Sequence, residues 1–147
     1  MFLTLAAAIV ILIVAVWWIK RKKDTRELAE HSITPEGLHA LLASNQHVLL
    51  FDVRQPLDLL ADSEIIPGST RLDPNDVIHN PSLIPREKDA IVYCTCPSDK
   101  TARSILSRAL ALKFVRVKFL RGGLGAWKAS GYPVEPYTKP FHLDPRA

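Results

Sequence analysis

The sequence predicts an α/β fold, in which a central parallel sheet is flanked by helices and preceded by a single transmembrane helix. Short apolar runs at residues 47–53 and 89–94 indicate strands covered on both faces, because they lack polar alternation. Segments with helical spacing separate these runs, and strands that alternate with helices form parallel sheets with right-handed crossovers. The third observation is an uncharged, apolar run over residues 1–19.

Residues 1–19 contain one polar side chain, Thr4. As a helix they would span about 28 Å, close to the hydrocarbon thickness of a bilayer. Trp17 and Trp18 end the run, and basic residues follow at once. A cleaved signal peptide would carry its charge before the apolar run, so we expect a transmembrane helix rather than a signal or a buried core helix. The basic flank predicts a single-pass membrane protein with its soluble domain facing the cytoplasm.

The 147 residues leave room for one globular domain after this segment. We expect a basic juxtamembrane linker at 20–31, the domain at 32–136 and an extended tail at 137–147. Five of the basic residues fall between Lys20 and Arg26, so the rest of the chain carries no clustered nucleic-acid footprint. The two cysteines exclude a disulfide framework and are typical of a reducing compartment.

The soluble part opens with a helix start signal, in which Thr34 is the N-cap and Pro35 the first helical residue. A helix of about ten residues should follow, and then the buried strand at 47–53. The turn at 65–69 predicts a brief edge strand, and Asp73 predicts a capped helical turn or two.

The second half contains the buried strand at 89–94 and the clearest helical periodicity of the domain, at 99–112. A third strand is predicted at 115–120, because its apolar residues alternate with charged ones. The segment "RGGLGAWKASGYP" then predicts a glycine turn, a short helix and a stop at Gly-Tyr-Pro.

The stretch "IVYCTCPSDKTAR" holds both cysteines where the second strand meets the long helix. Ligands of parallel sheets bind beyond the carboxyl ends of the strands. Backbone N–H groups and the helix N-terminus would lower the pKa of a thiol there, which makes Cys94 the candidate nucleophile. Lys100 and Arg103 would add positive charge, and Asp99 would cap the helix. The candidate active-site loop comprises Thr95, Cys96, Pro97, Ser98, Asp99, Lys100, Thr101, Ala102 and Arg103.

Other uses of two cysteines fit less well. Structural zinc needs four ligands and the histidines form no second pair, so we expect no metal. A thioredoxin-like pair has two intervening residues, whereas Cys94 and Cys96 have one. A cysteine-dependent phosphatase needs an arginine six residues after its nucleophile, and Arg103 is too far along from either cysteine. Two buried structural thiols remain an alternative.

Several motifs of the soluble part, in this order and spacing, resemble the rhodanese-like domain family. "LLFDVRQPLD" is similar to its Asp-Val-Arg segment, "IIPGS" to its Ile-Pro-Gly-Ala turn, "IVYC" to the strand that delivers the nucleophile, and "FLRGGLGAWKASGYPV" to its closing segment. The resemblance implies a central parallel sheet and a cysteine, here Cys94, that carries sulfane sulfur as a persulfide. It implies no cofactor. Asp52 and Arg54 would then help hold the core together near the site.

The chain departs from the family pattern in its loop, which is longer than the usual Cys-x-x-Gly-x-Arg and lacks its glycine. Cys96 has no counterpart in that pattern. It could attack the persulfide and leave a disulfide, accept the sulfur, or only pack in the loop. Activity assays on Cys94→Ser and Cys96→Ser would separate these roles.

These features predict a membrane-anchored sulfurtransferase that passes sulfur from a small anionic donor such as thiosulfate, through Cys94, to a thiol or cyanide acceptor. One alternative is a non-catalytic module of the same family that binds a protein partner at the membrane. Another is a redox or arsenate-handling thiol enzyme that cycles a Cys94–Cys96 disulfide.

Overall fold

The computed structural model describes residues 2–44, 46–95 and 100–140, without the side chains of residues 2–5, 24, 28 and 100. The chain divides into two compact units, residues 1–31 and 32–147.

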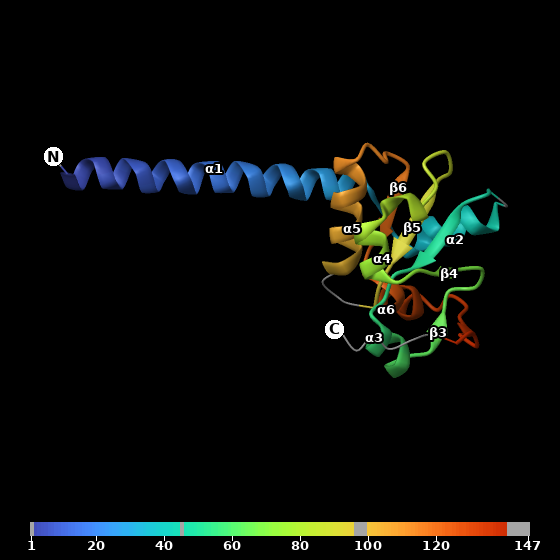
Figure 1. The fold of residues 1–147 in the computed structure, drawn as a ribbon. Helices are drawn as coiled ribbons and strands as arrows, with labels where there is room; N and C mark the ends of the chain where they lie inside the picture. The colour runs from blue at the N-terminus through green and yellow to red at the C-terminus, as the bar shows by residue number, and fades with distance from the viewer. Residues whose placement is uncertain (1, 45, 96–99, 141–147) are drawn as a thin grey trace. The chain divides into compact units, whose positions relative to one another are not determined.

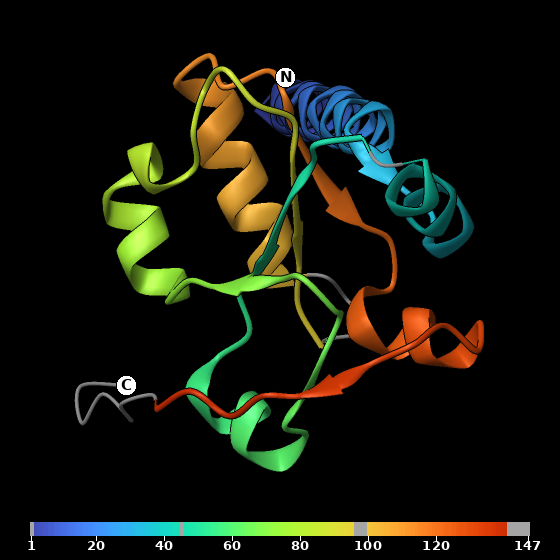
Figure 2. The same ribbon diagram turned by 90° about the vertical axis from the view of Figure 1, so that its right-hand side faces the viewer.

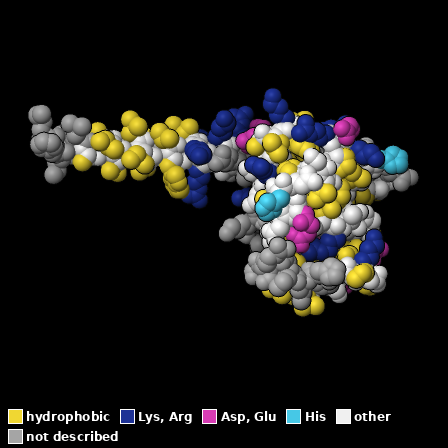
Figure 3. All heavy atoms as spheres, in the orientation of Figure 1, with side chains coloured by type: hydrophobic (Ala, Val, Ile, Leu, Met, Phe, Trp, Pro, Cys, Tyr) yellow, Lys and Arg dark blue, Asp and Glu magenta, His cyan; other side chains and the backbone are white. Residues whose placement is uncertain are grey.

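The first unit is one helix, α1, which runs from Phe2 to Glu30. It continues past the apolar run through the basic segment, where a linker is expected from the sequence. The guanidinium carbon of Arg21 lies 5.1 Å from the Trp17 ring centre, and Nζ of Lys22 lies 5.4 Å from that of Trp18. Large apolar side chains between Ile9 and Ile19 are exposed, and Figure 3 shows them on the helix ahead of its Lys and Arg residues.

Among the described residues, no helix combines the length and the apolar character that crossing a membrane requires. The predicted transmembrane helix over residues 1–19 is therefore not supported. The side chains of residues 1–5, which belong to that predicted segment, lie outside the described part of the chain. The charge-free run that remains, residues 6–19, is about 21 Å long as a helix, whereas a bilayer core is about 30 Å thick.

The second unit is built on a five-stranded sheet in the order β1-β6-β5-β2-β4, with every neighbouring pair parallel. Its strands are β1 (Ser32–Ile33), β2 (Leu49–Asp52), β4 (Thr70–Arg71), β5 (Ala90–Tyr93) and β6 (Val117–Leu120). This confirms the predicted α/β fold with a central parallel sheet. The predicted strands at 47–53 and 89–94 are adjacent interior strands, and β4 is the predicted edge strand.

Helices cover both faces of the sheet. They are α2 (Pro35–Ala43), α3 (Pro56–Ala61), α4 (Pro74–His79), the 3-10 helix η1 (Pro81–Leu83), α5 (Lys100–Ala111) and α6 (Gly123–Ala129). Figures 1 and 2 show α4 and α5 on one side of the strands, and α2 and α6 on the other. The carboxyl ends of β2, β4, β5 and β6 share one edge of this sheet because the strands are parallel.

Two helices begin where side-chain caps predict it. Oγ1 of Thr34 accepts a hydrogen bond from the Gly37 N–H at 3.1 Å, and Oδ1 of Asp73 accepts one from the Asn75 N–H at 2.8 Å. Each cap satisfies an N–H group that the first helical turn leaves without a partner.

One hydrophobic core lies between the sheet and the helices α2 and α6. Its buried members are Leu38, Leu50, Ile66, Ile91, Tyr93, Leu120, Leu124 and Trp127. Trp127 is 1% exposed, and its indole N–H donates to the carbonyl of Pro133 at 2.8 Å. Trp127 is thus a core aromatic residue.

Five short elements were not predicted. They are β1, α3, η1 and the antiparallel pair formed by β3 (Glu64–Ile65) and β7 (Glu135–Pro136). The pair fixes residues 135–136, so the chain still forms a strand immediately before the predicted tail. Residues 141–147 of that tail lie outside the described part of the chain.

Candidate active site

Cys94 follows directly on β5, at the carboxyl edge of the sheet, and is 1% exposed. Two successive carbonyl groups fix the backbone there. The carbonyl of Tyr93 accepts from the Val53 N–H at 3.0 Å, and that of Cys94 accepts from the Leu124 N–H at 2.8 Å. The strand end is thus held by β2 on one side and by α6 on the other.

The glycine turn before α6 allows this helix to approach the loop. Gly122 has a φ of 74°, and a Cβ atom built on it would lie 2.6 Å from Cβ of Ala126. A side chain at this position would therefore be strained and would also clash. A Cβ on Gly125 would lie 4.0 Å from the carbonyl oxygen of Thr95, which places α6 close to the loop just after Cys94.

Tyr93 ties the strand that carries Cys94 to the turn before β4. Its hydroxyl accepts from the Ile66 N–H at 3.2 Å and lies 2.9 Å from Oγ of Ser69. Burial, together with the charge of Asp52, raises the pKa of Tyr93 well above its ordinary range. The phenol therefore remains neutral and serves as a hydrogen-bonding group. From the sequence, Tyr93 is predicted only to be part of a buried strand.

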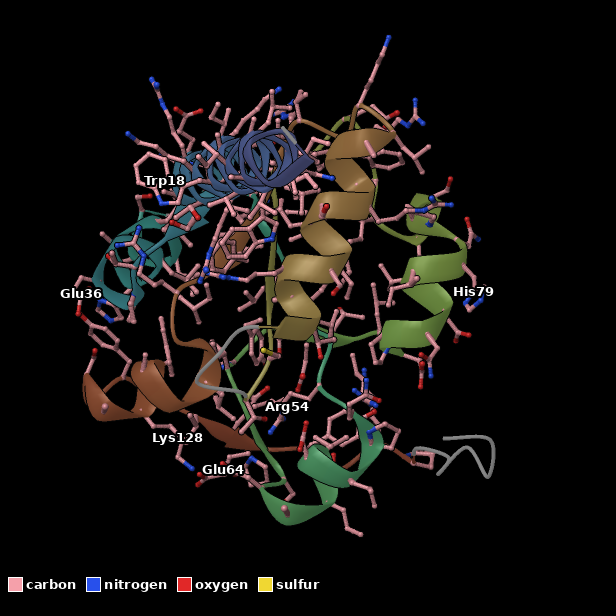
Figure 4. All side chains as sticks on the ribbon, turned by 90° about the vertical axis from the view of Figure 1, so that its left-hand side faces the viewer. Trp18, Glu36, Arg54, Glu64, His79 and Lys128 are labelled. Carbon is pink, nitrogen blue, oxygen red and sulfur yellow. The ribbon has the colours of Figure 1, made fainter. Side chains whose placement is uncertain are left out.

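Arg54 occupies the neighbouring strand end, after β2, and its side chain is fully buried. Its Nη2 lies 2.6 Å from Oδ2 of Asp52, and Nε lies 3.0 Å from each oxygen of that carboxylate. The remaining hydrogen bonds go to the carbonyls of Asp62 at 2.7 Å and Glu64 at 2.8 Å. Figure 4 labels Arg54 among these segments. Asp52 and Arg54 are the structural pair that the sequence predicted.

Further charged contacts join the same edge. Nη1 of Arg71 donates to the Arg54 carbonyl at 2.8 Å, which links β4 to the strand end after β2. Lys128 of α6 pairs with Asp62 at 3.0 Å and with Glu64 at 2.5 Å. Figure 4 shows Lys128 and Glu64 pointing toward one another. These contacts attach the segment between α3 and β3 to α6.

The candidate loop is described in part. Cys96, Pro97, Ser98 and Asp99 lie outside the described residues, so the predicted cap at Asp99 and the role of Cys96 stay predictions. Lys100, Thr101, Ala102 and Arg103 form the first turn of α5. Ala102 is buried against the sheet, whereas Arg103 is exposed, with its guanidinium carbon 6.0 Å from the Phe119 ring centre.

Thr95 has a feature that no sequence pattern indicated. Its Oγ1 is buried, yet it has no hydrogen-bond partner among the described residues, and no other buried side-chain polar atom there shares this state. Buried polar groups in proteins are almost always paired. The exception therefore lies on the residue that follows Cys94.

Over residues 2–44, 46–95 and 100–140, no group of three or more His, Cys, Asp or Glu side chains is arranged to hold a metal ion. The polar side chains described at the carboxyl edge include the Cys94 thiol and the hydroxyls of Tyr93, Ser69 and Thr95.

Comparison with known proteins identifies the family. Residues 34–130 match the rhodanese-like domain. The chain belongs to the rhodanese-like domain family. A curated relative called a sulfurtransferase, from Allochromatium vinosum, is 32% identical over 106 residues, which cover 71% of this chain and 94% of the relative.

Solved structures support the fold. A full-length protein from Lactobacillus plantarum is 19% identical, with a TM-score of 0.67, over 80% of this chain and 97% of that one. A thiosulfate sulfurtransferase from Pseudomonas aeruginosa is 23% identical, with a TM-score of 0.56, over 71% of this chain but only 19% of its own length. At these identities, the likeness concerns the rhodanese-like fold.

Proposed function

We propose that this chain is a sulfurtransferase whose Cys94 carries a sulfane sulfur as a persulfide. The observation that carries the proposal is the position of Cys94 at the carboxyl end of β5, where the N–H groups of Val53 and Leu124 bind the carbonyls of Tyr93 and Cys94, one on each side of the Cys94 Cα atom. Membership of the family and the relative called a sulfurtransferase support the reaction class.

In the proposed reaction, the Cys94 thiolate attacks the outer sulfur of thiosulfate. A sulfur–sulfur bond forms to Cys94, the bond to the sulfonate breaks, and sulfite leaves with the electron pair. A thiolate or cyanide acceptor then attacks the outer sulfur of the persulfide, which regenerates the Cys94 thiolate. The α5 N-terminus favours negative charge at this edge, and Lys100 and Arg103 would help attract an anionic donor.

The test is mass spectrometry of the purified chain after treatment with thiosulfate. We expect one added sulfur atom on Cys94 and none in Cys94→Ser. Cys96→Ser is the matched control, because it removes the chain's other thiol, and it should load sulfur as the unchanged protein does. If Cys96→Ser fails to load while Cys94→Ser loads, the nucleophile is assigned to the wrong cysteine.

A non-catalytic module that binds a partner protein is the alternative. The buried state of Cys94 favours it, because a thiol that is 1% exposed has little access to a donor. No sulfur adduct with thiosulfate, polysulfide or a persulfide donor would favour this alternative. A Cys94–Cys96 disulfide that forms during turnover would instead indicate the thiol redox class.

We also propose that α1 attaches the chain to a membrane. The described apolar side chains of α1 are exposed and lie on all sides of the helix. A helix that is apolar all round is usually either buried inside a protein or embedded in lipid. Trp17 and Trp18, each with a cation over its ring, precede a basic segment that suits the headgroup layer. The chain should sediment with membranes, and only an inserted helix should resist alkaline carbonate. Recovery in the supernatant at neutral pH would contradict membrane attachment.

A further inference from the structure

The unpaired hydroxyl of Thr95 raises a question that the proposed reaction leaves open. A buried hydroxyl without a partner costs roughly 1–3 kcal/mol, so such a group in a native protein requires an explanation. Within the described part of the chain, Oγ1 of Thr95 is the one buried side-chain polar atom in this state. The fold thus tolerates the cost beside the candidate nucleophile.

The position of Thr95 is fixed on the side of α6. The carbonyl of Cys94 is bound to the Leu124 N–H, and Gly125 lies against the Thr95 carbonyl. The hydroxyl therefore belongs to a residue whose backbone is held in place at the strand end. An anchored donor loses little freedom when it binds, which is the condition for preorganised stabilisation of charge.

Oγ1 of Thr95 has no hydrogen-bond partner among the described residues, and Cys94 is one of them, so the Cys94 sulfur does not pair with this hydroxyl in the resting protein. A group that is present only during turnover would satisfy it. Sulfur transfer adds one such group, the outer persulfide sulfur, which carries the negative charge.

We propose that the Thr95 hydroxyl donates a hydrogen bond to the outer sulfur of the Cys94 persulfide. This inference rests on the proposed function, and it assigns Thr95 a catalytic role that goes beyond it. The hydrogen bond stabilises the persulfide anion relative to its protonated form, and it thereby lowers the pKa of the persulfide. The resting thiol, with which the hydroxyl forms no hydrogen bond, should be unaffected.

The test uses the full chain with Cys96→Ser, so that Cys94 is the only thiol. Inorganic polysulfide loads the persulfide chemically, whether or not the protein accepts thiosulfate. The rate of alkylation with iodoacetamide is then measured at graded pH. It gives the pH at which half of the persulfide is ionised, the persulfide midpoint. The same measurement without loading gives the thiol midpoint of Cys94. The variants are Thr95→Val, which removes the hydroxyl at nearly constant volume, and Thr95→Ser, which keeps it.

We expect Thr95→Val to raise the persulfide midpoint by about one pH unit, a tenfold change in the ionisation constant, and to leave the thiol midpoint in place. Thr95→Ser should restore the original persulfide midpoint. An unchanged persulfide midpoint in Thr95→Val, or equal shifts of both midpoints, would overturn the assignment of Thr95. A protein that loads from polysulfide but not from thiosulfate would count against thiosulfate as donor, while the midpoints still decide the role of Thr95.

Discussion

Two neighbouring strand ends at the carboxyl edge of the sheet differ in how their polar groups are satisfied. After β2, the buried guanidinium of Arg54 binds the Asp52 carboxylate and the carbonyls of Asp62 and Glu64. After β5, the buried hydroxyl of Thr95 has no partner among the described residues. The polar groups described at the first strand end are hydrogen-bonded without a ligand, whereas the second strand end contains a hydroxyl that could still donate a hydrogen bond.

This difference distinguishes a structural role from a chemical role at one edge of the sheet. A buried ion pair whose hydrogen bonds are all satisfied contributes to the stability of the fold, since removing one partner leaves the other charge unpaired. An unsatisfied donor beside a nucleophile contributes when a substrate group arrives. Changes after β2 should therefore alter stability, and changes after β5 should alter reactivity.

The largest expected effect is that of Arg54→Met, which leaves the buried Asp52 carboxylate without its partner. We expect the free energy of unfolding to fall by about 3–5 kcal/mol. Urea unfolding can be followed by Trp127 fluorescence in a Trp17→Phe/Trp18→Phe background, because the chain has three tryptophans.

Arg116→Met is the matched control for this change. Arg116 forms an ion pair with Asp89 at 2.9 Å, but both side chains are about half exposed, so its loss should cost about 1 kcal/mol or less. Equal losses in the two variants would contradict the contrast between a saturated buried site and an exposed pair. The double variant Asp52→Leu/Arg54→Met should recover part of the stability, since it removes both charges.

Tyr93→Phe should have an intermediate effect. It removes the acceptor of the buried Ile66 N–H and the contact with Ser69, and we expect a loss of about 1–3 kcal/mol in the same unfolding assay. Sulfur loading of Cys94 should persist, because the Val53 and Leu124 N–H groups still hold the strand end. Ser69→Ala, which keeps the Ile66 contact, should cost less than Tyr93→Phe; the reverse order would show that Ser69 is the main partner of the phenol.

Local sequence signals predicted much of this fold. The capping residues Thr34 and Asp73 marked the starts of α2 and α4, and the apolar runs marked β2 and β5 as interior strands. Such signals depend only on residues close together in the chain, so they can be recognised in a single sequence. The structural pairing of Asp52 with Arg54 was also accessible, because the two residues are close in sequence and flank a buried strand end.

The elements that escaped prediction depend on distant partners. A two-residue strand has no periodicity, and β3 pairs with β7 about seventy residues further along the chain. Arg54 also binds the backbone carbonyls of Asp62 and Glu64. Because every residue has a backbone carbonyl, the sequence could not indicate these two partners. The lack of a hydrogen-bond partner for Oγ1 of Thr95 can be recognised only from a structure, because it depends on where the neighbouring polar atoms lie. A threonine after a cysteine says nothing about it.

The smallest expected effect is a pH dependence at the Asp62–Lys128 pair, which joins the saturated strand end to α6. Burial acts to raise the pKa of Asp62, but hydrogen bonds from Lys128 and the Glu64 N–H outweigh it, so the pKa lies below its ordinary value of 3.8. A carboxyl with a depressed folded-state pKa stabilises the fold above its unfolded pKa, and this contribution is lost as the pH falls through the folded value.

Asp62→Asn should therefore reduce stability by up to about 1 kcal/mol at pH 7, and the difference from the unchanged protein should shrink as the pH falls below about 3.8. Glu87→Gln is the charge-matched control at an exposed position, and its unfolding midpoint should follow the unchanged protein at both pH values. A stability difference for Asp62→Asn that stays constant with pH would mean that the carboxylate acts through its hydrogen-bonding geometry rather than its charge. The pair would then belong with the carbonyl contacts of Arg54, as part of the saturated strand end.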